Sequence, residues 1–313
     1  MSATTAASTA KRRQPPIRGG ASRPGWGGGA PYILLGPAVI LVAVFAAYPL
    51  LRSVWFAFND INPLARTMEF VGFDNLVAVL SAPQFWPLMG TTAWWVFGSV
   101  ALQLGFGLLL ALLLNTRFPL RGVVRGLVMI PWATPSVLIA LMWKWILDPN
   151  FGVLNRVLAG LGITTQPIEF LSSSSLALPT LIAVYVWQGI PLFAVMILAA
   201  LQAVSSDLRE AASIDGCGPW GIFRHVTLPA IAPTILITTV LRLIWSANYV
   251  DLIMILTGGG PGTSTTTLAL EAYLTAYKAT DFGQGAAYAL IQAAILTIFV
   301  VMYLRLTGRS ENS

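Results

Sequence analysis

Six long apolar runs limit what this chain can fold into more than any other feature of its sequence. Each is about 20 residues or longer, the length that a helix needs to cross the hydrocarbon core of a bilayer. Charged residues make up only 10% of the chain, against about 25% in soluble domains. The sequence therefore predicts an all-α polytopic membrane protein with six transmembrane helices, at approximately residues 32–51, 88–115, 126–147, 177–204, 234–256 and 282–304.

The segments outside these runs predict the domain organisation. Residues 1–31 are rich in Ala, Ser, Thr, Gly and Pro and carry several basic residues, a composition typical of a disordered tail. The first apolar run is too long for the core of a cleavable secretory signal, so we expect it to remain as the first span. We expect a basic tail at 1–31, one six-span domain at 32–306 and a short tail at 307–313.

Basic residues indicate the orientation of the spans. If the N-terminus is cytoplasmic, most of the Lys and Arg residues outside the spans lie on the inner side, whereas the outer loops hold only Arg66, Arg156 and Lys278. Positive residues favour the cytoplasmic side of a membrane. The sequence therefore predicts cytoplasmic termini, a cytoplasmic loop at 204–233 and an outer loop beginning at Thr257. The same placement explains the net charge of +6 without a nucleic-acid partner.

The loop at 204–233 is polar but patterned like two short helices. Asp207, with Glu210 three residues later, forms a capping box, so we predict that a helix starts there. Gly216 is suited to end it, because a helix often stops at a glycine in the left-handed conformation.

A second short helix is predicted after Gly218. Pro219 suits its first position, and Trp220 and Phe223, three residues apart, then share one face. The Leu228-Pro229 pair should end this helix. A folded pair of helices in a membrane-protein loop indicates a surface that docks into another protein.

The sequence offers no convincing catalytic, metal or nucleotide site. A single cysteine (Cys217) and a single histidine (His225) are too few for a cysteine or histidine metal site. The glycine run at 258–262 lacks the lysine of a phosphate-binding loop. Asp215 and His225 are the one close acid–histidine pair, and capping or surface roles explain them better. We therefore expect a protein that is not an enzyme and binds no cofactor itself.

Arg242 is the most costly residue within the spans, because insertion of an arginine near a helix centre costs roughly 2.5–3.5 kcal/mol. It forms a stripe with Trp245 and Tyr249, and Asn248 and Asp251 lie three apart on an adjoining stripe. These side chains could line a pathway for a hydroxyl-rich solute, or they could form an interhelical hydrogen-bond network. The candidate pathway also includes two polar-aromatic neighbours deeper in the fourth run, Trp187 and Gln188.

The 204–233 loop resembles the cytoplasmic signature of the permease subunits of bacterial binding-protein-dependent ABC importers. In that family an E-A-A stretch precedes D-G and, further on, L-P. The family usually has alanine after D-G, where this chain has Cys217. The matching residues here are Glu210, Ala211, Ala212, Asp215, Gly216, Leu228 and Pro229.

A second resemblance is to the carbohydrate-uptake branch of this family, which handles oligosaccharides, polyols and related solutes. It rests on the LTGGGP segment at 256–261 and on single residues around it and in the third span. Those residues are Asp251, Thr267, Tyr273, Phe282, Gly283, Pro131, Pro135, Trp143, Gly152 and Asn155.

The resemblance implies several partners and a location. A second, usually different, permease would complete the translocation path, and two cytoplasmic ATPase subunits would bind ATP and Mg²⁺. An extracytoplasmic binding protein would deliver the sugar. The resemblance implies the bacterial cytoplasmic membrane, with the chain crossing it several times.

The resemblance also implies a mechanism of alternating access. The loop from Glu210 to Pro229 would seat in a cleft of one ATPase, with Trp220 and Phe223 on its docking face. Closure of the ATPases would rotate the spans and open the pathway outward, and hydrolysis would reset it.

Three other functions remain open from the sequence. An ion-driven secondary transporter needs intramembrane acids, and Asp251 is the single candidate. An ABC permease for amino acids or phosphorylated solutes is the second; for phosphorylated solutes, several arginines would be expected in the path. The third, a membrane enzyme acting on lipid-linked sugars, lacks a catalytic pair.

Overall fold

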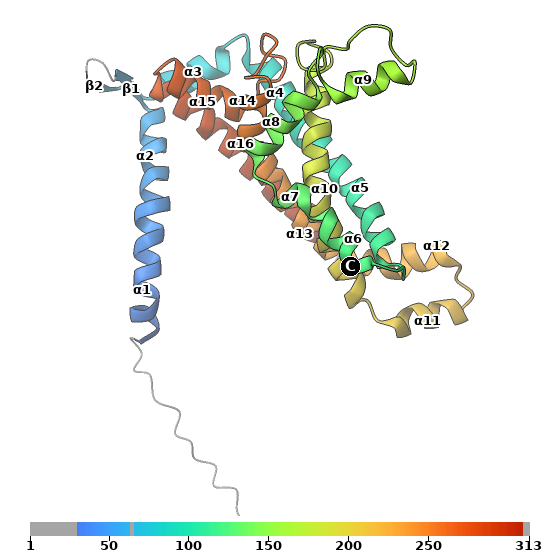
Figure 1. The fold of residues 1–313 in the computed structure, drawn as a ribbon. Coiled ribbons are helices and arrows are strands. Elements are labelled where there is room, and N and C mark those ends of the chain that lie inside the picture. The colour runs from blue at the N-terminus through green and yellow to red at the C-terminus, as the bar shows by residue number, and fades with distance from the viewer. Residues whose placement is uncertain (1–29, 63–65, 309–313) are drawn as a thin grey trace, which may run out of the picture. The chain divides into compact units, whose positions relative to one another are not determined.

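The computed structural model describes residues 30–62 and 66–308, which are mostly helical (Figure 1). Most of both predicted tails, residues 1–29 and 309–313, lies outside the described residues. The chain forms two compact units that divide between Leu51 and Arg52.

The first apolar run forms one continuous helix. It consists of α1 (Ala30–Val42), a π-helical turn, η1 (Ala43–Ala47), and α2 (Tyr48–Ala57). All side chains from 37 to 53 are exposed. A helix that is apolar and exposed on all sides requires lipid or another protein around it, which agrees with the predicted first span.

A small β-hairpin follows, so the prediction of an all-α fold is wrong at this point. Strands β1 (Asn59–Asn62) and β2 (Thr67–Phe70) pair antiparallel, with Asn59 opposite Phe70. The Asn75 side chain, at the start of α3 (Asp74–Ser81), donates hydrogen bonds to the carbonyls of Ala57 (3.2 Å) and Asn59 (2.9 Å). These bonds fix the hairpin to the following helix.

Five helices in the described residues are long and apolar enough to cross a membrane, and a bent pair raises the number to six. The predicted six spans are thus present if the bent pair counts as one. The long helices after the hairpin are α4 with η2 and α5 (Phe85–Ala93, Trp94–Gly98, Ser99–Asn115), α10 (Ala177–Ala203), α12 with η3 and α13 (Pro219–Ile222, Phe223–Thr227, Leu228–Ala247) and α16 (Phe282–Gly308).

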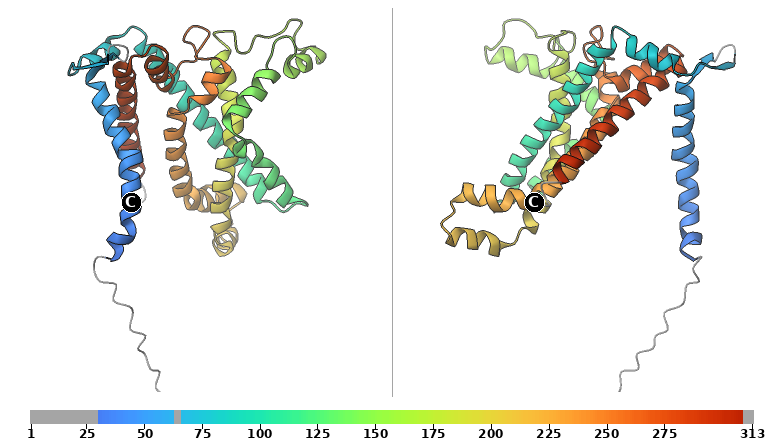
Figure 2. Two further views of the ribbon diagram at one scale, coloured as in Figure 1. Left: turned by 60° about the vertical axis from the view of Figure 1, so that its left-hand side comes forward. Right: turned by 180° about the vertical axis from the view of Figure 1, so that it is seen from behind.

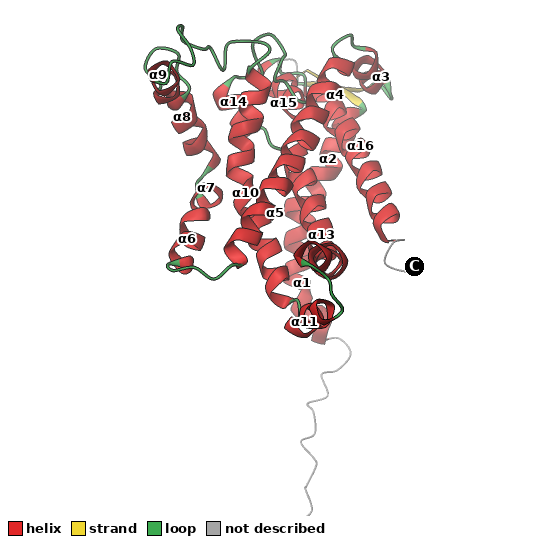
Figure 3. Cartoon of the chain, turned by 90° about the vertical axis from the view of Figure 1, so that its right-hand side faces the viewer, coloured by secondary structure: helices red, strands yellow, loops and turns green. Residues whose placement is uncertain are grey.

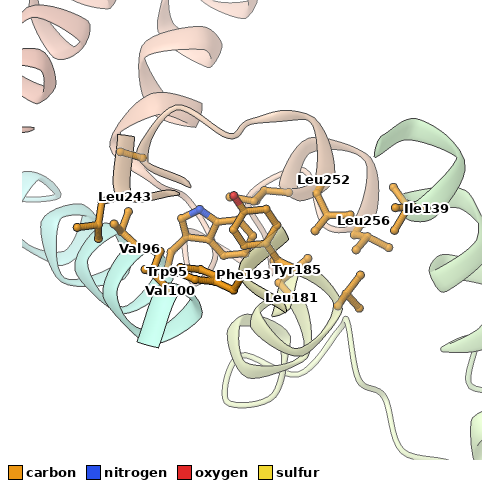
Figure 4. Close-up of a cluster of buried hydrophobic side chains, with 14 of the residues drawn as sticks. Trp95, Val96, Val100, Ile139, Leu181, Tyr185, Phe193, Leu243, Leu252 and Leu256 are labelled. Atoms are coloured by element: carbon orange, nitrogen blue, oxygen red, sulfur yellow. The ribbon is translucent and has the colours of Figure 1, made fainter. Parts of the chain in front are cut away.

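The core of the second unit lies between α5 and α10, which make the most extensive helix pair. Small residues allow this closeness, as is common between membrane helices. A side chain on Gly107 of α5 would collide with Cβ of Phe193 on α10. Figure 4 shows Trp95, Tyr185 and Phe193 packed together at this interface with aliphatic side chains around them.

The predicted third span is sharply broken. Helices α6 (Arg121–Val128) and α7 (Ile130–Ala133) meet α8 (Ser136–Ile146) at an angle of 92°. Thr134 and Pro135 are extended, with ψ angles of 132° and 137°. A proline disfavours the helical conformation in the residue before it, so Pro135 accounts for the break.

The predicted fifth span, 234–256, starts inside a longer helix. Its helix begins at Pro219 and runs without a break to Ala247, through the π-helical turn η3. The Leu228-Pro229 pair therefore does not end the short helix as predicted. Pro229 lies in the first turn after η3, and the preceding Leu228 N–H bonds the carbonyl of Phe223 across the wide turn. In that widened turn the missing proline N–H is tolerated.

The fifth span also breaks near its other end. α13 stops at Ala247, and a short helix, α14 (Asp251–Leu256), resumes after three residues. The Asn248 amide donates to Ile244 O, and Gln292 on α16 donates to Ala247 O, both at 2.9 Å. Side chains thus satisfy carbonyls that a continuous helix would use, which is how membrane helices tolerate such breaks.

The remaining elements close the two ends of the second unit. The turn between α5 and α6, the helix pair of the 204–233 loop and the end of α16 gather at one end (Figures 1 and 3). These segments and the start of α6 carry six of the basic residues predicted to be cytoplasmic: Arg117, Arg121, Arg125, Arg209, Arg224 and Arg305. Near the opposite end lie α9 (Val153–Gly160), α15 (Leu268–Tyr273) and η4 (Leu274–Lys278).

Candidate functional site

The first helix of the 204–233 loop is α11 (Ser206–Ile214). Its cap is not Asp207 as predicted: the Ser205 hydroxyl accepts the Asp207 N–H at 3.1 Å. A serine oxygen at the position before the helix satisfies a free amide there, so the cap lies two residues earlier than predicted and the helix starts at Ser206. Glu210, Ala211 and Asp215 are exposed, and Ala212 is half-buried.

Gly216 ends α11 as predicted. Its φ of +82° lies in the left-handed region. Gly216 N–H bonds Ser213 O at 3.1 Å, and Cys217 N–H bonds Ala212 O at 2.9 Å. This is the hydrogen-bond pattern of a Schellman motif, which turns the chain back toward α12.

The second helix, α12, begins with Pro219 after Gly218, as predicted. Trp220 and Phe223 share a face, with ring centroids 5.6 Å apart. Trp220 is 70% exposed and Ile214 86%. In both views of Figure 2 the α11–α12 pair (yellow to orange) projects from one end of the bundle. The loop therefore presents exposed apolar side chains on a capped, folded hairpin.

The two broken spans meet at a second location, which we call the junction: Ser136, Trp143, Trp187, Gln188, Tyr249 and Asp251. Helices α8 and α14 pack together, and their first residues are joined by a bond from the Ser136 hydroxyl to Asp251 Oδ2 at 3.2 Å. Both helices thus start beside each other at a break.

Aromatic and amide side chains complete the junction. The Tyr249 hydroxyl donates to Gln188 Oε1 at 3.0 Å, and Ser136 lies within hydrogen-bonding reach of the same hydroxyl. Trp187 packs edge-on against Trp143, with centroids 5.6 Å apart. Trp143 Nε1 is buried and has no hydrogen-bond partner among the described residues.

Arg242 lies beside the junction rather than in it. Only 6% of the residue is exposed, and its Nε donates to Gln103 Oε1 on α5 at 2.9 Å. Its guanidinium sits over the ring of Tyr185 on α10, 4.9 Å from the centroid. Nη2 has no hydrogen-bond partner within the described ranges. Arg242 therefore joins three helices of the core.

Tyr185 connects this network to the junction. Its ring lies 4.7 Å from that of Tyr249 and 4.7 Å from that of Trp95. Its hydroxyl hydrogen-bonds Ser246 at 3.0 Å, and Trp95 Nε1 donates to Ser246 O at 2.9 Å. The position of Tyr249 thus depends on a packed set of side chains from α10, α13 and η2.

The structure brings together only part of the predicted pathway. Trp187, Gln188, Tyr249 and Asp251 meet at the junction, and Asn248 forms the adjacent break. Trp245 is 43% exposed, and its side chain makes no hydrogen bond or ring contact to the described residues. The stripe predicted for an unbroken helix therefore does not form one surface.

Sequence reasoning missed several residues. Gln103 and Gln292 are buried amides within apolar runs, and such an amide in a span is a signal for an interhelical bond. Ser136 could have been noticed because it follows Pro135 directly. Among the residues that the structure describes, no group of three or more His, Cys, Asp or Glu side chains could hold a metal ion.

Comparison with known proteins gives the family. Residues 103–310 match the family described as "Binding-protein-dependent transport system inner membrane component". The trehalose/maltose transport system permease protein MalF of Thermococcus litoralis is 34% identical over 274 residues, covering 88% of this chain and 92% of that protein.

Two further relatives have a similar extent of match. The sulfoquinovosyl glycerol transport system permease protein SmoG of Agrobacterium fabrum is 34% identical over 88% of this chain and 89% of its own. The diacetylchitobiose uptake system permease protein DasB of Streptomyces coelicolor is 31% identical over 90% and 88%.

A solved structure shows the same fold. A chain of a bacterial ABC transporter that imports the acidic polysaccharide alginate superposes with a TM-score of 0.78, at 24% identity, over 89% of this chain and 94% of its own. Together with the family match, these comparisons show that the chain belongs to the inner membrane components of binding-protein-dependent transport systems, the permeases of ABC importers.

Proposed function

We propose that this chain is the membrane-spanning subunit of an ATP-driven importer that carries a sugar, either an oligosaccharide such as a disaccharide or a polyol, into the cell. The named relatives that transport trehalose and maltose, sulfoquinovosyl glycerol and diacetylchitobiose support this substrate class.

The junction is the observation that carries the proposal. Discontinuous helices in transporters form solute sites, because backbone and side-chain polar groups at a break are free for a ligand. Here two breaks coincide, and hydroxyl, amide and carboxylate groups stand beside two indole rings. Sugars present hydroxyl groups and apolar ring faces, which match such a lining.

Coupling to ATP is proposed through the Glu210–Pro229 loop. Its exposed apolar side chains suit a groove on an ATPase subunit, as in other helix-in-groove contacts. The helix from Pro219 to Ala247 is continuous over 29 residues, a length of about 43 Å. It runs from the docking surface to the break beside Tyr249, so a displacement of the loop would reach the junction through one continuous helix.

The complex would contain this chain, a second permease, two cytoplasmic ATPases that bind ATP and Mg²⁺, and an extracytoplasmic solute-binding protein. This chain would lie in the bacterial cytoplasmic membrane with both termini in the cytoplasm. The chain itself would bind no cofactor and catalyse no reaction.

Sugar uptake by the assembled complex tests the docking surface. Trp220→Ala should abolish ATP-dependent uptake of labelled trehalose, maltose or diacetylchitobiose, whichever the wild type transports. Trp86→Ala is the matched control, because Trp86 is 71% exposed and Trp220 70%. Wild-type uptake by the Trp220 variant, or uptake that survives ATP depletion and collapses with an ionophore, would overturn the proposal.

A further inference from the structure

A separate cavity lies at the far ends of the two helices that start at the junction. Helices α8 and α14 run side by side from Ser136 and Asp251. Near their other ends, Lys144 Nζ donates to Ile255 O at 3.3 Å. The eight steps along α8 from Ser136 to Lys144 correspond to about 12 Å. A cavity of about 400 Å³ opens there, and we call it the α8–α14 cavity.

The lining of this cavity combines apolar residues with polar and charged side chains. It includes Lys144, Asp148, Glu169, Phe170, Ser172 and Thr257. Lys144 offers N–H donors, the two carboxylates accept hydrogen bonds, and the hydroxyls do both. Phe170 adds a half-buried aromatic side chain. With one cation and two anions, the lining carries an excess of one negative charge.

The charged side chains of the lining do not pair with one another among the described residues. Among the described residues, no ion pair or hydrogen bond joins Lys144 to Asp148 or Glu169. Asp148 uses only Oδ1, which accepts the N–H groups of Asn150 and Phe151 at 2.8 Å each. Three ionised groups therefore line one cavity with bonding capacity left for a ligand.

One wall of the cavity is a stiff glycine-containing loop. Thr265 Oγ1 bonds Thr257 Oγ1 at 2.8 Å and Gly260 O at 2.9 Å. Gly259 has a φ of +97°, and a Cβ there would lie 2.5 Å from Thr266 Oγ1. A wall that is already ordered loses little conformational freedom when a ligand binds.

The chemistry of the lining selects the ligand. About 300–1,000 Å³ is usual for small-molecule sites, so the cavity holds a solute of one or two sugar rings. Mixed donors and acceptors suit many neutral hydroxyls, whereas the excess negative charge opposes an anionic solute. A neutral, hydroxyl-rich ligand fits best.

We propose that the α8–α14 cavity is a second binding site for the transported sugar, at the opposite end of the same two helices from Ser136 and Asp251. This inference rests on the proposed function, because it assigns the same solute to both sites. A sugar that leaves one site would remain against the same pair of helices as it reaches the other.

Cysteine protection tests the inference in the assembled complex without its binding protein. The chain has one cysteine, Cys217, so Cys217→Ser provides a background without thiols in this subunit. Ser172→Cys reports on the cavity and Ser136→Cys on the junction. Val153→Cys on the neighbouring helix α9, 46% exposed and outside the cavity lining, is the control. Each variant is treated with a membrane-impermeant methanethiosulfonate.

The expected result is that the transported sugar (maltose, trehalose or diacetylchitobiose) slows modification of the Ser172 variant several-fold and leaves the Val153 variant unchanged. Glu169→Gln should raise the sugar concentration needed for this protection about tenfold, the effect of losing one charge-assisted hydrogen bond. Glu69→Gln, a change at an exposed position on β2, should leave this concentration unchanged.

Three results would overturn the inference. Protection of the Ser136 variant alone leaves the proposed function intact but excludes sugar from the cavity. Protection of the Ser172 variant only when binding protein is added, with or without sugar, makes the cavity a protein-docking surface. No protection at either position, with no sugar uptake by the wild type, rejects the cavity and the proposed function together.

Discussion

At the scale of single residues, a buried arginine organises the core without a carboxylate partner among the described residues. Arg242 is held by one amide and one aromatic ring. Burying a guanidinium is costly, and a bond to Gln103 with a cation–π contact offsets part of that cost. Gly189 leaves the space, because a Cβ there would lie 2.5 Å from Arg242 Nη2 and would also collide with Gln103.

Gly189→Ala should therefore destabilise the complex, by about 1–3 kcal/mol, the usual effect of overpacking. Gly105→Ala on α5 is the control, since a Cβ at Gly105 meets nothing within 4 Å. That change should be neutral or stabilising by about 0.5–1 kcal/mol. Thermal unfolding of the purified complex compares the Gly189→Ala and Gly105→Ala variants. Equal melting temperatures for the two variants would contradict the packing described for Arg242.

Tyr249→Phe removes the hydrogen bond to Gln188 at the junction and keeps the ring against Tyr185. We expect the affinity for the transported sugar to fall about fivefold, the effect of roughly 1 kcal/mol, with an unchanged melting temperature. Tyr277→Phe, at a 67% exposed position, should change neither. If Tyr249→Phe binds sugar as the wild type does, its hydroxyl does not contact the solute.

The sequence identified Arg242, Tyr249 and Gln188 individually, because polar residues in apolar runs are conspicuous. It could not identify Gln103 as the partner of Arg242, since 139 residues separate them. It also could not predict which way the Trp245 side chain faces, because the helix that carries it ends two residues later, at Ala247.

At the scale of elements, turn chemistry was predictable and span ends were not. Gly216 and Pro219 act locally, so the hairpin of α11 and α12 followed from sequence. The strand NDIN lacks a regular alternation of apolar and polar residues, and TMEF alternates over only four residues, so the β-hairpin was missed. The break at Asn248 depends on Gln292, whose side chain donates a hydrogen bond to the Ala247 carbonyl. Because these two residues are 45 positions apart in the sequence, the break could not be predicted locally.

Gly216→Pro tests the hairpin as an element. Proline fixes φ near −65°, whereas Gly216 has a φ of +82°, so α12 should no longer fold back toward α11. We expect loss of ATP-dependent uptake with an unchanged melting temperature, because the loop lies at the end of the bundle.

Gly218→Ala is the matched control for this change. Gly218 has a φ of −70°, and a Cβ there meets nothing within 4 Å, so uptake should persist. Normal uptake by the Gly216→Pro complex would mean that the hairpin geometry is not needed for docking.

At the scale of the whole molecule, one helix connects the 204–233 loop to the junction. It begins at Pro219 in the projecting loop and ends at Ala247, beside the broken spans. The sequence predicted a loop and a span as separate elements, because Leu228-Pro229 resembled a helix end. The π-helical turn η3 overrides that local signal, and the helix continues through it to Ala247.

The most direct test of the account interrupts this helix between its ends. Ile237 is 66% exposed, so Ile237→Pro removes a backbone hydrogen bond, at a cost of about 3 kcal/mol, with little loss of packing. Ile237→Ala is the control for the side chain, and Ile237→Gly weakens the helix less severely. Sugar uptake and ATP hydrolysis are measured together on the same proteoliposomes.

We predict that the Ile237→Pro complex still hydrolyses ATP but no longer couples hydrolysis to uptake, that Ile237→Gly is intermediate, and that Ile237→Ala matches the wild type. Uptake per ATP equal to wild type in a folded Ile237→Pro complex would contradict the claim that this helix transmits motion from the loop to the junction.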